Sequence, residues 1–272
     1  MSLAVDDAGD VVVGDAGMLR AFELKAGGSV PQEIDFGTYI NAGALDVDGN
    51  GNIYTFSDYR SFEVLMANAG DRSVVALPFG GALGAISGGG LAVNRHGDVF
   101  VTKYGTGTVF ELKSGATSPV VHSLGDPLTA GITVDDAGNL FAIQYVAESN
   151  EGRIIELKTG ETTPVVLPFA PIRAPLDIDV DDNGNLYVSA VRADGVGEVL
   201  KFVPGAVAPT VVPISGDWVF SGVAVSGDGR NIYVGGGQID SGLWGSKVLR
   251  LSIPDRVPEP SGFGSLGEPF GS

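Results

Sequence analysis

The chain has 272 residues, and its 33 acidic and 16 basic residues give it a net charge of −17. Nucleic-acid binding draws on clustered Lys and Arg, so this balance argues against a nucleic acid as partner. The absence of Cys excludes disulfides, thiolate nucleophiles and Cys-ligated zinc. No run of about 18 apolar residues occurs, which predicts a chain without a membrane span.

One phrase recurs six times along the chain, as in ITVDDAGNLFA from Ile132 and IDVDDNGNLYV from Ile178. Its central valine repeats at steps of 42, 46, 41, 46 and 45 residues. Short strands and Gly-rich turns that repeat about every 40 to 50 residues are typical of a β-propeller with one blade per repeat. We therefore predict an all-β, six-bladed β-propeller that forms one domain over residues 1–272, with blades starting near residues 2, 43, 89, 131, 176 and 221. The shared valines are Val5, Val47, Val93, Val134, Val180 and Val225.

Each repeat is predicted to form a blade of four antiparallel strands. The first strand ends at the shared valine, and a tight turn containing Gly follows it. The second strand is rich in β-branched and aromatic residues, as at 185–190, and the third alternates, as at 108–113. A turn rich in Lys, Gly and Thr leads to the fourth strand, as at 164–169.

The C-terminal tail predicts how the ring closes. The last repeat has its third strand at 247–252, and the end of the chain, SLGEPFGS at 265–272, matches SLGDPLTA at 123–130, which leads into a first strand. The chain therefore ends in the repeat phase in which it begins. We predict that residues 257–266 form the outer strand of blade six, so that the ring closes between the C-terminal tail and the first repeat, because an open ring would expose strand edges.

Two stretches carry a resemblance to a known family. VVLPFAPIRAPLDIDVDDNGNLYV at 165–188, with EVLKF at 198–202, resembles the NHL repeat and is similar to the extracellular sensor domain of bacterial receptor Ser/Thr kinases. The resemblance covers all six repeats but departs in the second hairpin, where the family usually has Asp-x-Gly-Asn-Asn-Arg and only 14–17 and 104–107 come near it. The family includes ligand-sensing domains, protein-binding platforms and a few lyases, so the resemblance implies the fold without fixing the function.

Two repeats match the opening of a calcium loop, with the pattern Asp-x-Asp-x-Asn-Gly starting at Asp46 and at Asp179. Such a loop also needs a bidentate Glu at its twelfth position. Ser57 and Ala190 stand there instead. We therefore expect the polar side chains of these turns to accept hydrogen bonds from the nearby backbone.

Asp46 and Asp179 also form a pair, because each directly precedes a shared valine where the other repeats carry Ala or Thr. Their repeats are three apart, so the two blades lie opposite each other in a ring of six. If this position faces the axial channel, the two carboxylates could hold a calcium or another divalent cation weakly. The alternative is that both are solvated channel residues. Beyond this pair we predict no cofactor.

The histidines and the known catalytic motifs offer no active site. His96 is predicted in a turn and His122 in an outer strand, so they are too far apart for an acid–base pair. Six-bladed metal hydrolases such as the gluconolactonase group place Glu, Asn and Asp on the inner strands, and the inner strands of this chain lack such a set. A nucleophile elbow, a P-loop and a zinc-protease motif are all missing.

The two faces of the disc differ in chemistry. Antiparallel strands reverse at each turn, so turns one–two and three–four lie on what we call the first face, and all other connections lie on the second face. The first face carries Asp6, Asp7, Asp10, Asp48, Asp98, Asp135, Asp136, Asp181, Asp182 and Asp228. The second face is variable and rich in the Tyr, Trp and Arg that dominate binding sites. Its predicted contact residues are Tyr59, Arg60, Tyr104, Tyr145, Arg173, Arg192, Trp218 and Trp244, although the aromatic residues, Trp218 above all, could instead fill gaps between blades.

These observations predict a monomeric binding or sensing module for a protein, a cell-wall fragment or a small ligand, acting through the second face. The alternative is a lyase or hydrolase that uses the axial channel, with or without a divalent metal. The sequence enters its first repeat within three residues. The protein is therefore expected to be cytoplasmic, or extracellular or in the cell envelope if a signal or anchor has been removed.

Overall fold

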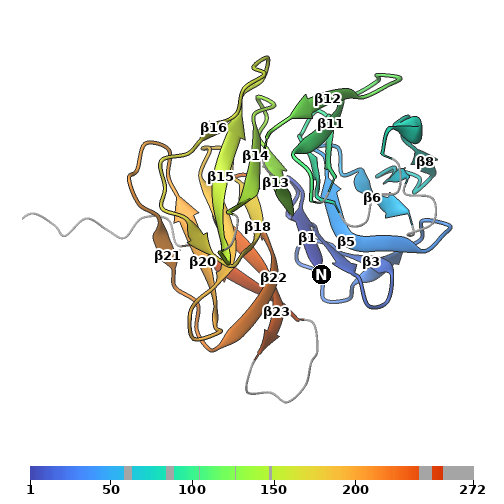
Figure 1. Ribbon diagram of the computed structural model, residues 1–272. Helices are drawn as coiled ribbons and strands as arrows, with labels where there is room; N and C mark the ends of the chain where they lie inside the picture. The colour runs from blue at the N-terminus through green and yellow to red at the C-terminus, as the bar shows by residue number, and fades with distance from the viewer. Residues whose placement is uncertain are drawn as a thin grey trace, which may run out of the picture.

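The computed structural model of the chain describes residues 1–57, 63–83, 89–103, 105–125, 127–146, 149–238 and 247–253. It confirms an all-β propeller of six antiparallel sheets around a central axis (Figure 1). The one helical segment within these ranges is a 3-10 turn, η1 (Gly80–Ala82). No helix in this part of the chain is long and apolar enough to cross a membrane.

The first three blades each pair four strands in chain order. Blade one contains β1 (Ser2–Val5), β2 (Val11–Asp15), β3 (Arg20–Leu24) and β4 (Gln32–Ile34). Blade two contains β5 (Ile40–Val47), β6 (Ile53–Ser57), β7 (Val64–Ala67) and β8 (Val74–Ala76). Blade three contains β9 (Leu91–Val93), β10 (Val99–Thr102), β11 (Thr108–Leu112) and β12 (Val120–Ser123).

The last three blades vary the pattern. Blade four contains β13 (Leu128–Val134), β14 (Leu140–Val146), β15 (Glu151–Leu157) and β16 (Val165–Val166), and a fifth short strand, β17 (Ile172–Arg173), also pairs with β15. Blade five contains β18 (Pro175–Val180), β19 (Leu186–Val191), β20 (Gly197–Phe202) and β21 (Thr210–Val212). Blade six contains β22 (Trp218–Val225), β23 (Asn231–Gln238) and β24 (Lys247–Ser252). Its predicted outer strand at 257–266 lies outside the described residues.

The inner strands form a closed ring. Each of β1, β5, β9, β13, β18 and β22 packs beside the next, and β22 returns to β1. The first and last blades approach closely, because a Cβ added to Gly235 of β23 would lie 3.2 Å from Cδ1 of Leu3 in β1. The described residues therefore already bring blades one and six together.

The core is divided among the six blade interfaces, with one apolar cluster between each pair of neighbouring blades. Strand β14 shows why. Phe141 and Ile143 pack toward blade five, whereas Leu140 and Ala142 pack toward blade three. Side chains alternate across a strand, so a sheet covered on both faces needs apolar residues at successive positions. This explains the continuous apolar runs of the second strands.

The aspartates after the inner strands cap turns, as the sequence predicts. Oδ1 of Asp181 accepts hydrogen bonds from the N–H groups of Asn183 and Asn185, at 3.0 and 2.9 Å. Its Oδ2 accepts from Asn185 Nδ2 at 2.8 Å and from the hydroxyl of Tyr187 at 3.1 Å. Asp48 makes the same four contacts in blade two. In blade five the turn is completed by Gly184, whose φ of 74° favours glycine.

Candidate functional site

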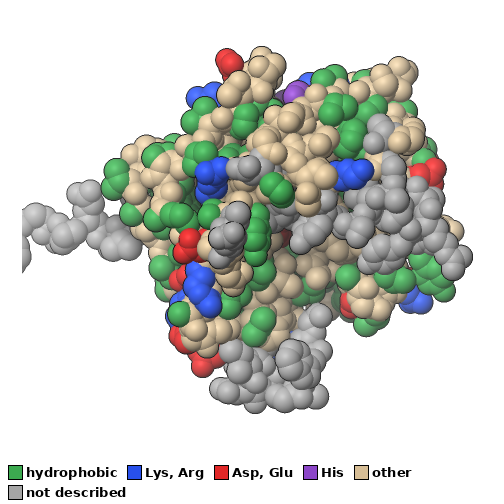
Figure 2. All heavy atoms as spheres, viewed as in Figure 1, with side chains coloured by type: hydrophobic (Ala, Val, Ile, Leu, Met, Phe, Trp, Pro, Cys, Tyr) green, Lys and Arg blue, Asp and Glu red, His purple; other side chains and the backbone are tan. Residues whose placement is uncertain are grey.

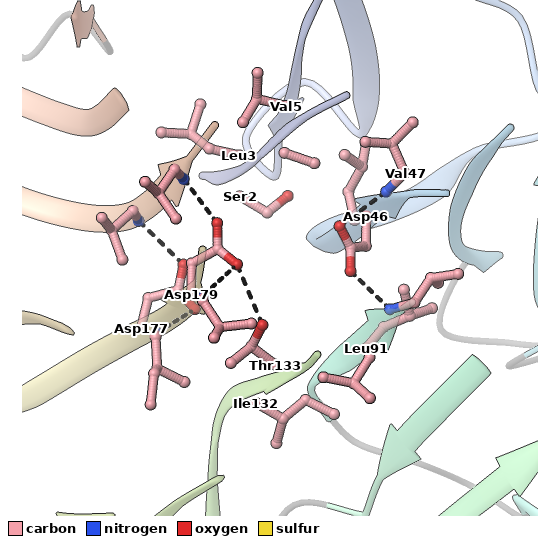
Figure 3. Close-up of a pocket in the computed structure, with 18 of the residues that line it drawn as sticks. Ser2, Leu3, Val5, Asp46, Val47, Leu91, Ile132, Thr133, Asp177 and Asp179 are labelled. Atoms are coloured by element: carbon pink, nitrogen blue, oxygen red, sulfur yellow. Dashed lines mark hydrogen bonds between the residues drawn. The ribbon is translucent and has the colours of Figure 1, made fainter. Parts of the chain in front are cut away.

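The inner strands enclose an axial cavity of about 190 Å³, which is the candidate site. Its wall includes carboxylates from two opposite blades (Figure 3). Asp46 comes from β5 in blade two, whereas Asp177 and Asp179 come from β18 in blade five. Thr133 of β13 lies beside Asp179, and its hydroxyl donates to Asp179 Oδ1 at 3.2 Å.

Each of these carboxylates holds two inner strands together. Oδ2 of Asp179 accepts from the N–H of Val225 at 2.7 Å, and Oδ2 of Asp177 accepts from the N–H of Val223 at 3.1 Å. Asp46 accepts in the same way from the N–H of Val93 in blade three, at 2.7 Å. An inner strand has one edge without a strand partner, and these carboxylates satisfy donors along that edge.

The cavity also shifts the acidity of the three carboxylates. Surrounding protein removes solvating water and raises the pKa of Asp177 to about 6 and that of Asp179 to about 7. The pKa of Asp46 is raised well above its usual range, first by desolvation and then by the negative charge of Asp179. Hydrogen bonds from the backbone oppose the shift in all three, but desolvation is larger.

The sequence-based pair Asp46 and Asp179 therefore lines one cavity from opposite sides (Figure 3). One oxygen of Asp46 accepts from Val47 at 2.8 Å and one of Asp179 accepts from Val180 at 2.8 Å, so both oxygens of each carboxylate already have a backbone donor. Within the described ranges, no group of three or more acidic or His side chains is arranged to hold a metal. A weak cation site remains a prediction.

Arg95, which the sequence analysis did not single out, spans the first-face end of the cavity. Its Nη2 lies 2.8 Å from Asp182 and 3.1 Å from Asp7, and its Nη1 lies 3.3 Å from Asp136. The partners belong to blades five, one and four. The sequence does contain a signal for this site. The second residue after the shared valine is Asp in repeats one, four and five, Gly in repeats two and six, and Arg in repeat three, so one basic residue faces three acidic ones at the same repeat position.

The second face holds only some of its predicted contact residues at the surface. Tyr145 is 49% exposed, whereas Trp218 is 9% exposed and packs in the cluster between blades five and six, with its Nε1 donating to the carbonyl of Ser215 at 3.0 Å. Most of the Trp218 ring is therefore out of reach of a partner. Tyr59, Arg60, Tyr104 and Trp244 lie outside the described residues.

The two described arginines of this face are exposed but held in place. Nη1 of Arg173 donates to the carbonyls of Val191 and Arg192, at 2.9 and 2.6 Å, and so ties blade four to blade five. Nη2 of Arg192 pairs with Asp194 at 2.7 Å. Both side chains are therefore oriented before any partner binds.

Two further exposed residues on the second face were missed from the sequence. Tyr39, in the link between blades one and two, is 66% exposed, and Met18, in the β2–β3 turn, is 61% exposed. The N–H of Ile40 donates to the carbonyl of Leu19 at 3.5 Å, which brings the two loops together. Other exposed hydrophobic side chains include valines of the outer strands β12, β16 and β21, and on the face shown in Figure 2 hydrophobic side chains lie among other types.

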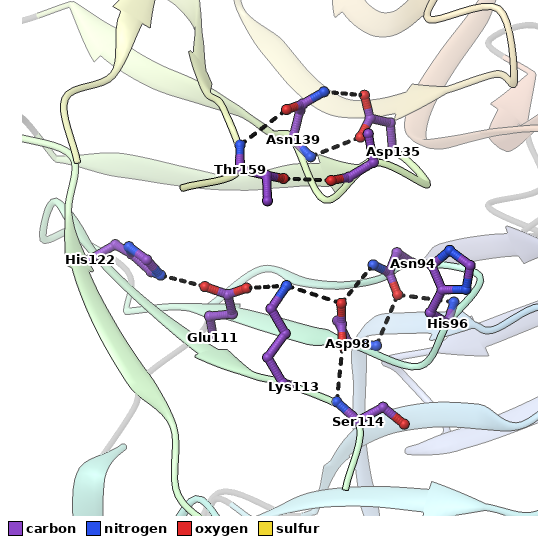
Figure 4. A network of polar contacts seen from close by, with 11 residues as sticks. Asn94, His96, Asp98, Glu111, Lys113, Ser114, His122, Asp135, Asn139 and Thr159 are labelled. Carbon is purple, nitrogen blue, oxygen red and sulfur yellow. Dashed lines mark hydrogen bonds and ion pairs between the residues drawn. The ribbon is translucent and has the colours of Figure 1, made fainter. Parts of the chain in front are cut away.

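Blade three carries a polar chain that includes one histidine (Figure 4). His122 Nε2 lies 2.6 Å from Glu111 Oε2, and Glu111 Oε1 lies 2.7 Å from Lys113 Nζ. Lys113 Nζ continues to Asp98 Oδ2 at 3.1 Å. His96, in the β9–β10 turn, joins the far end of this network through its backbone: its N–H donates to Asn94 Oδ1 at 3.0 Å, and Asn94 Nδ2 donates to Asp98 Oδ2 at 3.0 Å (Figure 4). The chain braces neighbouring strands of one blade, and the two histidines do not form a pair.

Comparison with known proteins identifies the fold alone. The sequence matches no family model, and no curated protein is similar to it in sequence. Among solved structures, virginiamycin B lyase from Staphylococcus aureus is similar with a TM-score of 0.60 at 14% identity, over 93% of this chain and 80% of that one. Aldose sugar dehydrogenase from Streptomyces coelicolor gives a TM-score of 0.63 at 13% identity, over 92% and 93%. A chain of the nidogen/laminin complex gives 0.63 at 14% identity, over 89% and 88%.

Proposed function

We propose that the protein is a binding or sensing module that engages a protein, a cell-wall fragment or a small ligand through its second face. The contrast between the two faces carries this proposal. On the second face Tyr39, Tyr145 and Met18 are largely exposed. On the first face, buried aspartates such as Asp181 are used to cap turns, and Arg95 spans the end of the cavity.

The chemistry of the second face suits a partner. Tyr offers a large contact area with a directed hydroxyl, and Tyr and Arg are enriched where binding energy concentrates. Met adapts its shape to different apolar surfaces. Tyr39 and Met18 lie on adjoining loops, so one ligand can contact both. Arg192 adds a cation that Asp194 holds in place.

Two likenesses support the same proposal. The repeat resembles the NHL repeat of bacterial sensor domains, and a similar propeller occurs in the nidogen/laminin complex, a protein–protein assembly. In this proposal the domain works as a monomer at the cell surface or in the envelope. The fold itself hosts both enzymes and binding proteins, so it does not decide between them.

One observation favours a second candidate, a lyase or hydrolase that uses the axial cavity. Asp177 and Asp179 have pKa values of about 6 and about 7, which suit proton transfer at neutral pH. Two features oppose it. The cavity of about 190 Å³ is smaller than ligand pockets of about 300 to 1,000 Å³. The oxygens of both carboxylates are also engaged by backbone donors.

Substitution on the two faces tests the proposal. The double variant Tyr39→Ala/Tyr145→Ala removes two exposed aromatic side chains from the second face. Val207→Ala is the matched control, because Val207 is 89% exposed on the first face, in the β20–β21 turn. The wild type and both variants are immobilised and used to capture proteins from envelope and soluble fractions, and each is separately titrated with peptidoglycan fragments. We expect loss of binding only in the double variant. Equal binding by all three proteins would contradict the proposal.

A further inference from the structure

The contact between blades six and one, which we call the closing seam, leaves an apolar side chain uncovered. Each third strand carries an apolar residue at one register position, three residues before the residue that pairs, through the second strand, with the shared valine. In blade six this residue is Val248 of β24, which is 40% exposed. In the other blades it is at most 2% exposed. The five buried equivalents are Ala21, Val64, Val109, Ile154 and Val199.

The side chain of Val248 lies on the side of its sheet that faces blade one. Val248 is paired with Gly235 of β23, and residues directly opposite each other project from the same face of a sheet. A Cβ added to Gly235 would lie 3.2 Å from Cδ1 of Leu3 in blade one. The equivalent Val199 faces the next blade in the same way and packs in the cluster between blades five and six. Val248 therefore belongs to the closing seam.

In the other blades the outer strand, or the link that follows it, supplies the missing cover. Each of the other five clusters contains an apolar residue from that segment. These residues are Phe36, Phe79, Leu124, Ile172 and Val212. Within the described ranges, the cluster at the closing seam takes its buried members from first and second strands alone. One apolar side chain from an outer segment is therefore needed to complete it.

The C-terminal tail, residues 254–272, contains a segment with the right pattern. SLGEP at 265–269 repeats SLGDP at 123–127, which follows the third strand of blade three. The leucine of the earlier copy, Leu124, is 3% exposed and packs between blades three and four. In the tail the corresponding residue is Leu266, which lies outside the described residues.

The tail is long enough to bring Leu266 to the closing seam. Leu112 and Leu251 hold the same register position on the third strands of blades three and six. The path from Leu251 to Leu266 is three residues longer than the path from Leu112 to Leu124. A longer turn between the third and fourth strands takes up this difference.

We propose that the closing seam is the docking site of the C-terminal tail, with Leu266 as the anchor that covers Val248. The outer strand predicted within 257–266 thereby gains a register. Ser265 lies opposite Lys247, as Ser123 lies opposite Thr108 in blade three. Phe263 takes the place of Val121, which is 58% exposed, so only the leucine turns into the seam.

Substitution of the anchor is the first test, measured as thermal unfolding of the full chain. Leu266→Ala should lower the melting temperature by roughly 5 to 10 °C, because it removes a buried leucine side chain. Phe263→Ala is the matched control, because it truncates a large apolar residue of the same segment at an exposed register position. It should shift the melting temperature by less than about 2 °C. Equal shifts in the two variants would overturn the proposal.

Engineered cysteines test the register independently, even if Leu266→Ala does not fold. The chain has no Cys, so Lys247→Cys/Ser265→Cys can form a single intramolecular disulfide across the proposed pair. Opposite Cα atoms of antiparallel strands lie about 4.5 to 5.5 Å apart, within the span of a disulfide. Mild oxidation should therefore close this bond in most monomers, as measured by intact-mass spectrometry.

The matched control moves one cysteine along the tail. In Lys247→Cys/Ser261→Cys the second thiol is four residues away, which adds about 13 Å along an extended strand. This pair should stay largely reduced under the same conditions. Equal disulfide yields in the two variants, or no disulfide at position 265, would overturn the proposal. Neither experiment depends on binding at the second face, so its outcome is separate from the proposed function.

Discussion

The carboxylate of Asp179 accepts a hydrogen bond from the backbone N–H of Val225 at 2.7 Å, and so joins the inner strands of blades five and six. Asp46 makes the equivalent contact with Val93 between blades two and three, also at 2.7 Å. The two contacts lie three blades apart. Both satisfy backbone donors along unpaired strand edges, and both hold a carboxylate in a narrow cavity where water is scarce.

We expect the stability of the protein to fall as the pH rises from about 5 to about 8. In the folded state the pKa of Asp177 is about 6, that of Asp179 is about 7, and that of Asp46 is raised well above its usual range. In the unfolded chain the pKa of Asp is about 4. Between these pH values the folded state therefore binds more protons than the unfolded chain, so raising the pH favours unfolding. Urea denaturation at several pH values measures the change.

Urea denaturation of single variants at the same pH values identifies the residues that cause the pH dependence. Asp179→Asn should flatten the pH dependence, because it removes one of the groups that take up a proton on folding. Glu161→Gln, at an exposed turn position, should leave the dependence unchanged. A free energy of unfolding that stays constant between these pH values in the wild type would show that the cavity carboxylates titrate normally.

Calcium should bind the wild type weakly at best. The oxygens of Asp46 and Asp179 already accept backbone hydrogen bonds, and burial in the cavity raises the pKa of both carboxyl groups, so protons compete with a bound cation near neutral pH. Isothermal titration calorimetry measures the affinity. A submicromolar dissociation constant that Asp179→Ala abolishes would instead support a metal-dependent enzyme.

Removing the turn cap Asp181 should lower the free energy of unfolding. Asp181→Ala leaves two backbone N–H groups and the hydroxyl of Tyr187 without their acceptor, in a buried turn. We expect a loss of about 1 to 3 kcal/mol in the free energy of unfolding. Tyr187→Phe removes one of these donors, so the double variant should lose less than the sum of the two. Strict additivity would show that the hydroxyl contact contributes nothing.

Deleting residues 256–272 should lower the melting temperature and promote aggregation, if this segment supplies the outer strand of blade six. Strand β24 is the last described strand of its sheet, and an uncovered edge pairs readily with other chains. Differential scanning calorimetry and light scattering provide the measurements. An unchanged melting curve would mean that β1 and β22 close the ring without help from the tail.

The fold could be predicted because it repeats. The spacing of the shared valines fixes the number of blades, and each blade is built from local hairpins. The same count shows that Asp46 and Asp179 belong to opposite blades. Tyr39 and Met18 could not be found this way, because they lie in connections that differ between blades. The burial of Trp218 between blades five and six is the alternative that the sequence analysis left open for this residue.

Arg95 shows a different limit of sequence reasoning. A basic residue in an acidic turn reads as a surface charge, and its three partners lie far away in the sequence. Only the closed ring brings Asp7, Asp136 and Asp182 to one point. Aligning the repeats at this position exposes the signal, since Gly49 and Gly227 leave space beside a charged side chain.

Site-specific photo-crosslinking tests the central claim, that the second face binds the partner. A photoreactive residue is placed at Tyr39 in one protein and at Val207, exposed on the first face, in another. Both are irradiated with the fraction or fragment that the wild type captures, and the adducts are identified by mass spectrometry. The proposal expects adducts from position 39 and none from position 207. Adducts from position 207 alone would place the binding surface on the first face and contradict the account.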